Sequence, residues 1–245
     1  TLAINAKAAS MRQAGVDVIS FGVGEPDFDT PSHIRQAGVR AIEDGFTRYT
    51  AAGGIPELKE AIVEKFRSDN RLSYERDEVM VSCGGKHVLY NLAQATLNPG
   101  DEVIIPRPCW VSFPEQVRLA GGRPILVDTR DHQLDCDKIK RAVTSKTKAI
   151  LINSPNNPSG QVYDQATLDA LGALLDEEGR RHGNAIVLIM DEPYRSILFD
   201  GHQAASTLRA SRNAIVLSSW SKELSLAGER IGYLAVHPEI DEHGA

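Results

Sequence analysis

Lys222 follows an apolar run and lies among residues that suit chemistry at its amine. The small side chains of Ser219 and Ser221 leave room for a bulky group near that amine. Arg230, eight residues further on, has the planar cationic fork that binds phosphate oxygens in pairs. A lone loop lysine is usually only a solvated side chain. Together with Arg230 and the small neighbours, Lys222 becomes a candidate for chemistry beside an anionic group.

Two more polar clusters directly follow apolar runs. Asp191 and Tyr194 come after the run 186–190. The segment 153–160, which reads Asn-Ser-Pro-Asn-Asn-Pro-Ser-Gly, comes after the run 148–152. Taken alone, a carboxylate in this position is as readily a helix cap, and a segment of such composition is first of all a turn. Their shared position after apolar runs makes both clusters candidates for a ligand site.

A glycine pair offers a place for an anion. Gly84 and Gly85 follow the run 78–82 and precede a helical pattern. Glycines at a helix N-terminus let backbone N–H groups approach an anion, and the helix dipole favours negative charge there. Such a pair is more often an ordinary tight turn, so its position among the other clusters is what makes it a candidate.

Seven candidate strands alternate with helical patterns. Runs such as 149–152 and 186–190 are apolar throughout, which is typical of strands covered on both faces of a parallel sheet. The predicted strands are 78–82, 102–106, 124–128, 148–152, 186–191, 214–218 and 231–236. The predicted helices are 31–45, with Thr30 as N-cap and Pro31 as first residue, and 56–66, 86–97, 113–120, 136–143 and 165–181. We therefore predict a three-layer α/β/α fold with a seven-stranded, mostly parallel sheet and a ligand at the carboxyl ends of the strands.

Composition favours a small-molecule enzyme. The 245 residues carry a formal charge of −6 with both signs interspersed, so we expect no partner among nucleic acids and no anionic membrane surface. The three cysteines are widely spaced, which indicates free thiols in a reducing compartment. No apolar run is long enough for a bilayer and the start does not resemble a signal peptide, so we expect a cytoplasmic protein. The chain lacks an initial Met and stops in polar residues, and we expect a fragment.

The segment 219–232 carries a resemblance to a known family. It reads Ser-x-Ser-Lys-x-x-Ser-Leu-x-Gly-x-Arg-Ile-Gly and agrees at every defined position with the lysine signature of class I, fold type I aminotransferases, which use pyridoxal 5′-phosphate (PLP). The resemblance implies that Lys222 forms a Schiff base with PLP and moves the proton between the substrate Cα and C4′ of the cofactor. It also implies that Ser219 and Arg230 hold the phosphate.

The same resemblance assigns further cofactor contacts. Asp191 is similar to the aspartate that pairs with the pyridine nitrogen and keeps it protonated, so that the ring acts as an electron sink. Tyr194 and Asn157 resemble the residues that bind the 3′-oxygen of the ring, with Ser159 standing where the family has threonine. The expected cofactor site also includes Gly84, Gly85, Lys86, Trp110, Ser221 and Tyr49.

Substrate and partner contacts follow from the resemblance as well. The stretches 22–28 and 48–54 resemble family segments in which Gly24 lies against the substrate carboxylate and Tyr49 reaches the phosphate of a neighbouring subunit, which implies a homodimer. Lys86 would bind the distal carboxylate of aspartate or glutamate, or only line the phosphate loop. The expected substrate-binding residues are Gly24, Lys86, Trp110 and Asn157.

The family resemblance extends from Gly22 to about His237, and the stretch from Tyr49 through Trp110 looks most like the bacterial aspartate aminotransferase branch. The segment 223–229 differs from that branch and resembles other class I members. We therefore expect a PLP-dependent transaminase that moves an amino group from an amino acid, with aspartate preferred, to a 2-oxo acid such as 2-oxoglutarate. A lyase or decarboxylase of the same fold, a non-catalytic PLP-binding regulatory domain and an inactive fragment remain alternatives. We expect residues 1–25 to associate with a small domain, 26–245 to form the PLP-binding large domain, and the arginine that binds the substrate α-carboxylate to lie beyond residue 245.

Overall fold

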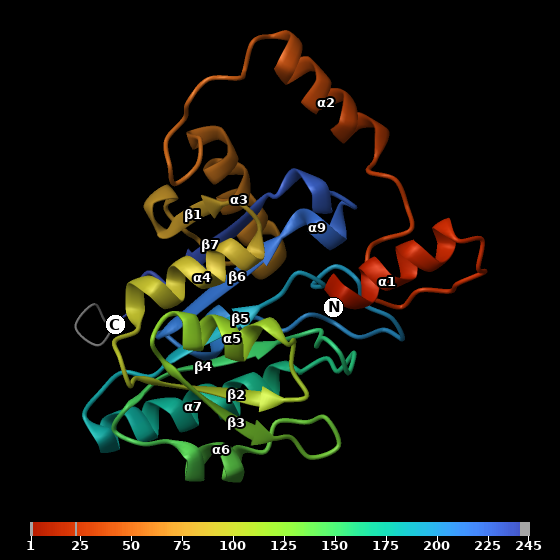
Figure 1. The fold of residues 1–245 in the computed structure, drawn as a ribbon. Helices are drawn as coiled ribbons and strands as arrows, with labels where there is room; N and C mark the ends of the chain where they lie inside the picture. Colours follow the sequence, from red (N-terminus) through yellow and green to blue (C-terminus); the bar gives the residue numbers. More distant parts are fainter. Residues whose placement is uncertain (1, 23, 241–245) are drawn as a thin grey trace.

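A seven-stranded sheet forms the centre of the molecule. The computed structural model describes residues 2–22 and 24–240 (Figure 1). The strands are β1 (Val79–Ser82), β2 (Glu102–Arg107), β3 (Arg123–Asp128), β4 (Thr147–Asn153), β5 (Val187–Asp191), β6 (Ala214–Ser219) and β7 (Gly232–Val236). They lie in the order β1-β7-β6-β5-β4-β2-β3. All seven predicted strands are present, with ends that differ by at most one residue.

The sheet is mostly parallel, as predicted, and β7 is the exception. It runs antiparallel to both of its neighbours, β1 and β6, while the pairs β2–β3, β2–β4, β4–β5 and β5–β6 are parallel. Gly232, the first residue of β7, therefore pairs with the last residues of its two neighbours, Ser82 and Ser219. The carboxyl ends of the other inner strands lie at that same edge.

Helices cover both faces of the sheet. Along β4, Ile150 and Ile152 face one apolar cluster and Ala149 and Leu151 face the other, which is the alternation expected of a strand buried on both sides. The first face is covered by α3 (Pro56–Asn70), α6 (Cys136–Ala142), α7 (Gln165–His182) and the short α8 (Thr207–Ala210). The second is covered by α4 (Gly85–Thr96) and α5 (Ser112–Leu119). The three-layer prediction is thus confirmed.

The N-terminal segment contributes nothing to this core. It holds α1 (Leu2–Gln13), a helix not predicted from the sequence, and α2 (Ser32–Glu43), which lies away from the sheet in Figure 1. From residue 3 to residue 61 no described residue is buried, and Phe21 and Phe28 are 95% and 79% exposed. The division of the chain at residue 26 stays a prediction.

One predicted helix start is wrong. Thr30 is not the N-cap of α2, because the helix begins at Ser32 and Pro31 occupies the cap position without a side-chain hydrogen bond. The Thr30 hydroxyl instead donates a 2.6 Å hydrogen bond to the carbonyl oxygen of Ser225. A long-range partner has replaced the local one that the sequence pattern suggested.

Further short elements complete the described chain. They are the 3₁₀ turns η1 (Arg76–Glu78) and η2 (Ala227–Glu229) and the short helix α9 (Trp220–Glu223). Cys83, Cys109 and Cys136 are free thiols, as predicted. None of the helices within 2–22 and 24–240 has the length and apolar character needed to cross a membrane.

Candidate active site

One edge of the sheet collects the polar clusters that follow the strands. Asn153 and Asp191, the last residues of β4 and β5, are register partners in adjacent strands. Two strands away from β4, β6 ends at Ser219, which pairs with Gly232. The clusters predicted from separate parts of the sequence therefore lie along a single sheet edge, where ligands of parallel α/β sheets bind.

The glycine pair adjoins the predicted phosphate-binding side chains. Gly84 has φ of +86° and precedes α4, and a β-carbon added to it would collide with the Arg230 guanidinium. A β-carbon on Gly85 would lie 3.6 Å from Cβ and 3.7 Å from Oγ of Ser219. Gly84, Gly85, Ser219 and Arg230 thus converge at the N-terminus of a twelve-residue helix, where backbone N–H groups and the dipole favour an anion.

Close backbone packing sustains this arrangement. A β-carbon on Gly232 would lie 2.5 Å from the backbone nitrogen of Gly85 and 2.6 Å from the carbonyl carbon of Gly84, so only glycine fits there. Arg230 has φ of +54°, and its Nη1 donates a 2.8 Å hydrogen bond to the carbonyl oxygen of Ala227. The guanidinium is thus held by its own turn. The backbone of Arg230 has a left-handed conformation there, which non-glycine residues adopt at a cost.

The segments after β4 and β5 are tied together by side-chain amides. Asn157 Nδ2 lies 3.4 Å from the hydroxyl oxygen of Tyr194, so the two residues predicted to bind one cofactor oxygen are neighbours. Asn153, which is 2% exposed, donates from Nδ2 to the carbonyl oxygen of Asp191 at 2.7 Å. Its Oδ1 accepts a 2.6 Å hydrogen bond from the backbone N–H of Asn157. Sequence reasoning gave Asn153 no role, because an asparagine in a turn-like segment looks like part of the turn.

The carboxyl of Asp191 is in an environment that disfavours its charged form. Burial, followed by the charge of Glu192, raises its pKa from 3.8 to about 7. The residue as a whole is only half-buried, so the desolvation concerns its carboxyl group and not the whole residue. A cation placed against it, such as a protonated pyridine nitrogen, would restore the ionised form.

A second buried carboxylate, missed at the sequence level, lies beside Asp191. Glu192 is 4% exposed and forms a 3.0 Å ion pair with Nη1 of Arg195. The same nitrogen donates a 2.7 Å hydrogen bond to the carbonyl oxygen of Ala205. Burial raises the pKa of Glu192, and Arg195 opposes that rise. Nothing in the sequence separates Glu192 from a solvated acid, because its pairing with Arg195 is visible only in the structure.

Lys222 lies in α9, directly after β6, with Ser221 half-buried beside it. Its Nζ donates a 2.5 Å hydrogen bond to the carbonyl oxygen of Gly24. The N-terminal segment thus passes over the lysine, and the predicted substrate-binding glycine meets the predicted catalytic amine. This contact joins residues 198 positions apart in the chain.

Lys86 and Trp110 also meet. Lys86 Nζ lies 4.8 Å from the centre of the Trp110 ring, a cation–π contact. The indole packs edge-on against Phe113, with ring centres 5.5 Å apart. The exposed amine at the first turn of α4 is therefore held on the side of Trp110, next to the glycine pair.

Tyr49 does not join the other predicted residues. It is fully exposed, at 108%, on the segment between α2 and α3. Its predicted contact with a neighbouring subunit stays a prediction.

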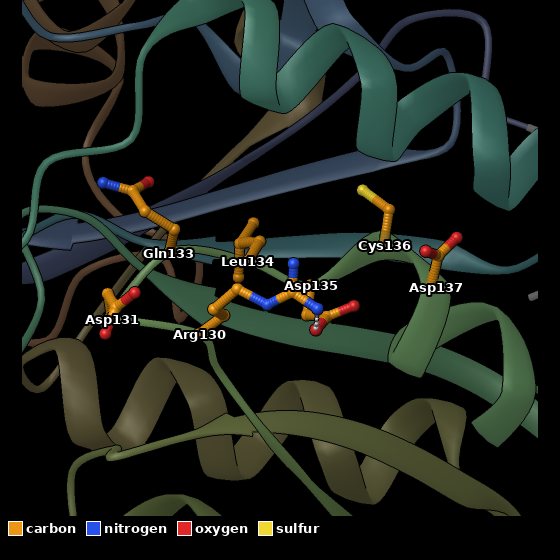
Figure 2. Close-up of a pocket in the computed structure, with 7 residues that line it drawn as sticks. All are labelled: Arg130, Asp131, Gln133, Leu134, Asp135, Cys136 and Asp137. Atoms are coloured by element: carbon orange, nitrogen blue, oxygen red, sulfur yellow. Dashed lines mark ion pairs between the residues drawn. The ribbon is translucent and has the colours of Figure 1, made fainter.

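A cavity elsewhere on the chain holds none of the predicted site residues. It has a volume of about 380 Å³ and lies between the end of β3 and the start of α6 (Figure 2). Arg130 extends toward Asp135 there and forms a 3.6 Å ion pair with it. Asp135 is already engaged as the N-cap of α6, because its Oδ1 accepts a 3.1 Å hydrogen bond from the backbone of Lys138. Within the described residues, no group of acidic, His and Cys side chains is arranged to hold a metal ion.

The residues at the sheet edge fit PLP. The close approach of Gly84 to Arg230 leaves a surface without β-carbons next to a guanidinium and a helix N-terminus, as a phosphate requires. The desolvated carboxyl of Asp191 suits a cationic ring nitrogen, and the adjacent Asn157 and Tyr194 offer donors for a ring oxygen. A lysine amine, Lys222, is present for covalent attachment.

Comparisons with known proteins agree with this fit. Residues 16–244 match the family model for aminotransferase class I and II. The chain is 45% identical to aspartate aminotransferase of Bacillus sp. (strain YM-2) and 43% identical to aspartate/prephenate aminotransferase of Thermus thermophilus, in each case over 98% of this chain and 62% of the relative. It spans about three fifths of the length of the curated relatives it matches.

Solved structures show the same likeness. The fold matches that of aspartate aminotransferase from Thermus thermophilus with maleate, with a TM-score of 0.89 and 43% identity over 96% of this chain and 61% of that chain. The aspartate aminotransferase from Rhizobium meliloti matches with a TM-score of 0.87 and 40% identity, over 96% of this chain and 59% of that chain. The chain therefore belongs to the class I and II aminotransferase family, whose members depend on PLP.

Proposed function

We propose that this chain is the cofactor-binding part of an aminotransferase that moves an amino group from an amino acid, with aspartate preferred, to a 2-oxo acid such as 2-oxoglutarate. The observation that carries this proposal is the convergence at one sheet edge of a lysine amine, a desolvated carboxyl and an anion cradle. The names of the relatives, aspartate and aspartate/prephenate aminotransferases, support the choice of aspartate.

The cofactor would be held at both of its ends. Gly84, Gly85, Ser219 and Arg230 would bind the phosphate, with the backbone N–H groups of α4 aimed at it. Asp191 would hold a proton on the ring nitrogen, because the ion pair removes the cost of its buried charge. The remaining ring contacts would come from Asn157, Tyr194 and Trp110. When bound, PLP supplies an electron sink for the negative charge that develops on the substrate carbon.

Lys222 would carry the proton transfer. Its amine would attach the cofactor. Once displaced by the substrate amine, it would take a proton from the substrate Cα and deliver it to C4′ of the cofactor. General acid–base catalysis by a positioned side chain contributes about 10²- to 10⁴-fold to rate. In the structure the amine donates a hydrogen bond to the Gly24 carbonyl oxygen. Ser221 leaves space beside it.

Substrate contacts would come from the rim of the site. Lys86, held against Trp110, would offer a cation for the distal carboxylate of aspartate, and Gly24, which accepts a hydrogen bond from Lys222, would lie against the substrate carboxylate. We place the arginine for the α-carboxylate in a C-terminal small domain that follows this large domain, with residues 1–25 packing against it. We also propose a cytoplasmic homodimer in which Tyr49 of one subunit reaches the phosphate of the other.

The first experiment is reduction of the cofactor linkage. The chain would be mixed with PLP, its visible absorbance recorded, and the complex reduced with borohydride and mapped by mass spectrometry. A visible band with a pyridoxyl adduct on Lys222 supports the proposal, and the Lys222→Ala variant should lose both. An adduct spread over surface lysines would overturn it.

The reaction type is tested separately. With aspartate and 2-oxoglutarate, amino transfer yields glutamate and oxaloacetate, whereas a decarboxylase of the same fold releases CO₂ and does not need the 2-oxo acid. Glutamate formation that depends on both substrates supports the aminotransferase. Product formation without the 2-oxo acid would favour a lyase or decarboxylase instead.

A further inference from the structure

We propose that Asn153 is a positioning residue that sets the spacing between the two side chains binding the cofactor ring, Asp191 and Asn157. The inference rests on the proposed function and assigns a role to a residue that makes no predicted cofactor contact of its own. It is carried by two hydrogen bonds from one buried side chain, one to each of the two segments.

Both polar atoms of the Asn153 side chain make hydrogen bonds. It is 2% exposed at the end of β4, with Nδ2 donating to the Asp191 carbonyl oxygen at 2.7 Å and Oδ1 accepting from the Asn157 backbone N–H at 2.6 Å. Both partners lie where the strands end. Because these two backbone groups belong to the residues whose side chains would bind the ring, the amide acts directly on their spacing.

These contacts complete a closed ring of connections. From Asp191 the chain continues three residues to Tyr194, whose hydroxyl oxygen lies 3.4 Å from Asn157 Nδ2. The backbone of Asn157 returns to Asn153, and Asn153 returns to Asp191. Three residues predicted to bind the cofactor ring are therefore joined through one amide. Loss of that amide breaks this closed series of contacts at its buried end.

Asparagine suits this position because both a donor and an acceptor are needed on one short, planar group. An ionised aspartate has the same shape but only acceptors, and alanine has neither. A buried backbone group that loses its partner without gaining water is costly, so the segments would shift to find new partners. The expected consequence is a displaced carboxyl and amide at the ring.

The neighbouring Asn156 does not share the role. It is also buried, but its Oδ1 accepts from the backbone N–H and the hydroxyl of Ser159, which closes only the local turn. Asn153 is thus the residue of this segment that reaches across to the strand bearing Asp191.

A matched control is the asparagine that contacts the opposite end of β4 from Asn153. Asn184 Nδ2 donates a 2.8 Å hydrogen bond to the carbonyl oxygen of Thr147, the first residue of β4. Removing this amide also frees a backbone carbonyl of β4, but far along the strand from the carboxyl edge. Asn184→Ala therefore separates loss of stability from loss of positioning.

The test compares Asn153→Ala with Asn184→Ala and the unaltered chain. PLP affinity is measured by absorbance titration, the pH dependence of the bound cofactor's absorbance is recorded, and the melting temperature is measured without PLP. We expect Asn153→Ala to bind PLP about tenfold more weakly, ~1.4 kcal/mol, and to shift the pH midpoint of the absorbance change. Asn184→Ala should lower the melting temperature and leave both cofactor readouts unchanged.

Each outcome bears on the inference. Equal PLP affinity and an equal pH midpoint in Asn153→Ala and the unaltered chain overturn it while leaving the proposed function intact. If the unaltered chain itself fails to bind PLP at Lys222, the proposed function fails and this inference with it. Should Asn153→Ala not fold, Asn153→Asp is measured instead. That variant keeps the acceptor for Asn157 and loses the donor to Asp191, so weakened PLP binding is again expected, and unchanged binding again overturns the inference.

Discussion

The amine of Lys222 donates a 2.5 Å hydrogen bond to the carbonyl oxygen of Gly24. The contact brings the N-terminal segment, which has no buried residue among those described before Ile62, onto the amine proposed to be catalytic. A second tie, from the Thr30 hydroxyl to the Ser225 carbonyl, lies three residues past the lysine in the chain. The segment is therefore attached to the site by polar contacts and not by an apolar core.

Removing the amine of Lys222 tests its proposed catalytic role. Lys222→Ala should lose amino transfer by about 10²- to 10⁴-fold or more, since both the covalent attachment and the proton transfer depend on this nitrogen. The measurement is the initial rate of glutamate formation. The control is Lys138→Ala, a partly exposed lysine paired with Asp135, which should retain activity. A Lys222→Ala variant with undiminished activity would show that another group carries the proton.

Cutting the second tie tests whether the N-terminal segment supports the site. Thr30→Val keeps the side-chain shape and removes the hydroxyl that donates to Ser225. Loss of one net hydrogen bond, about 1 kcal/mol, should raise the protease sensitivity of residues 24–30 and lower kcat/KM about fivefold. Thr47→Val is the matched control, because that hydroxyl makes only a long, exposed contact to its own turn. Identical digestion patterns in the two variants would contradict the prediction.

The Asp191 carboxyl should make the stability of the PLP-free protein fall with rising pH. Its pKa is 3.8 in an ordinary environment and about 7 here. Between those values the folded state binds a proton that the unfolded state has lost, so the stabilising contribution is full below about pH 4 and disappears as pH rises to about 7.

Asp191→Asn should remove that dependence. Above pH 7 the PLP-free variant should be about 2–4 kcal/mol more stable than the unaltered chain, and added PLP should stabilise the variant much less. Urea unfolding at pH 5, 6.5 and 8 measures both effects. Asp164→Asn is the control, since the pKa of that helix-capping carboxyl is lowered by Thr167 and it stays ionised throughout this range. Parallel pH curves for Asp191→Asn and the unaltered chain would disprove the assignment.

The free energy of unfolding should depend more strongly on the buried ion pair beside Asp191 than on an exposed ion pair. Arg195→Gln leaves Glu192, which is 4% exposed, without its cation and should cost about 3–5 kcal/mol of unfolding free energy. Arg67→Gln, which breaks an exposed pair with Glu64, should cost at most about 1 kcal/mol. Adding Glu192→Gln to Arg195→Gln should recover part of the loss, and the absence of any recovery would mean that the cost comes from packing instead.

Glycine is required at position 232 for the close backbone approach behind the proposed phosphate site. Gly232→Ala would push a β-carbon into the backbone of Gly84 and Gly85, costing about 1–3 kcal/mol and weakening PLP binding. Gly228→Ala is the control, because an added β-carbon there meets nothing within 4 Å. Calorimetric melting with and without PLP distinguishes the two. Equal PLP stabilisation of both variants would contradict the proposed close approach.

Local pattern was sufficient for most elements and for the identity of the candidate residues. Apolar, β-rich runs predicted all seven strands, and several of these runs are apolar nearly throughout because a strand covered on both faces needs apolar side chains on both sides. The helix α1 was missed because its apolar residues, such as Ile4 and Met11, do not form a buried face. Its sequence therefore lacks the periodic signal that burial imposes on other helices.

The sequence by itself determined which groups are present: Lys222, Asp191, Asn157 and the glycine pair, each after an apolar run, and Arg230 just before one. Only the tertiary structure decided their relations. The antiparallel insertion of β7 between β1 and β6 brings Gly232 against Gly84, and the adjacency of β4 and β5 lets Asn153 join Asp191 to Asn157. Such contacts depend on strand order and on hydrogen-bond donors and acceptors that come from distant segments. The packing of the whole chain sets both, so neither produces a local periodicity in the sequence.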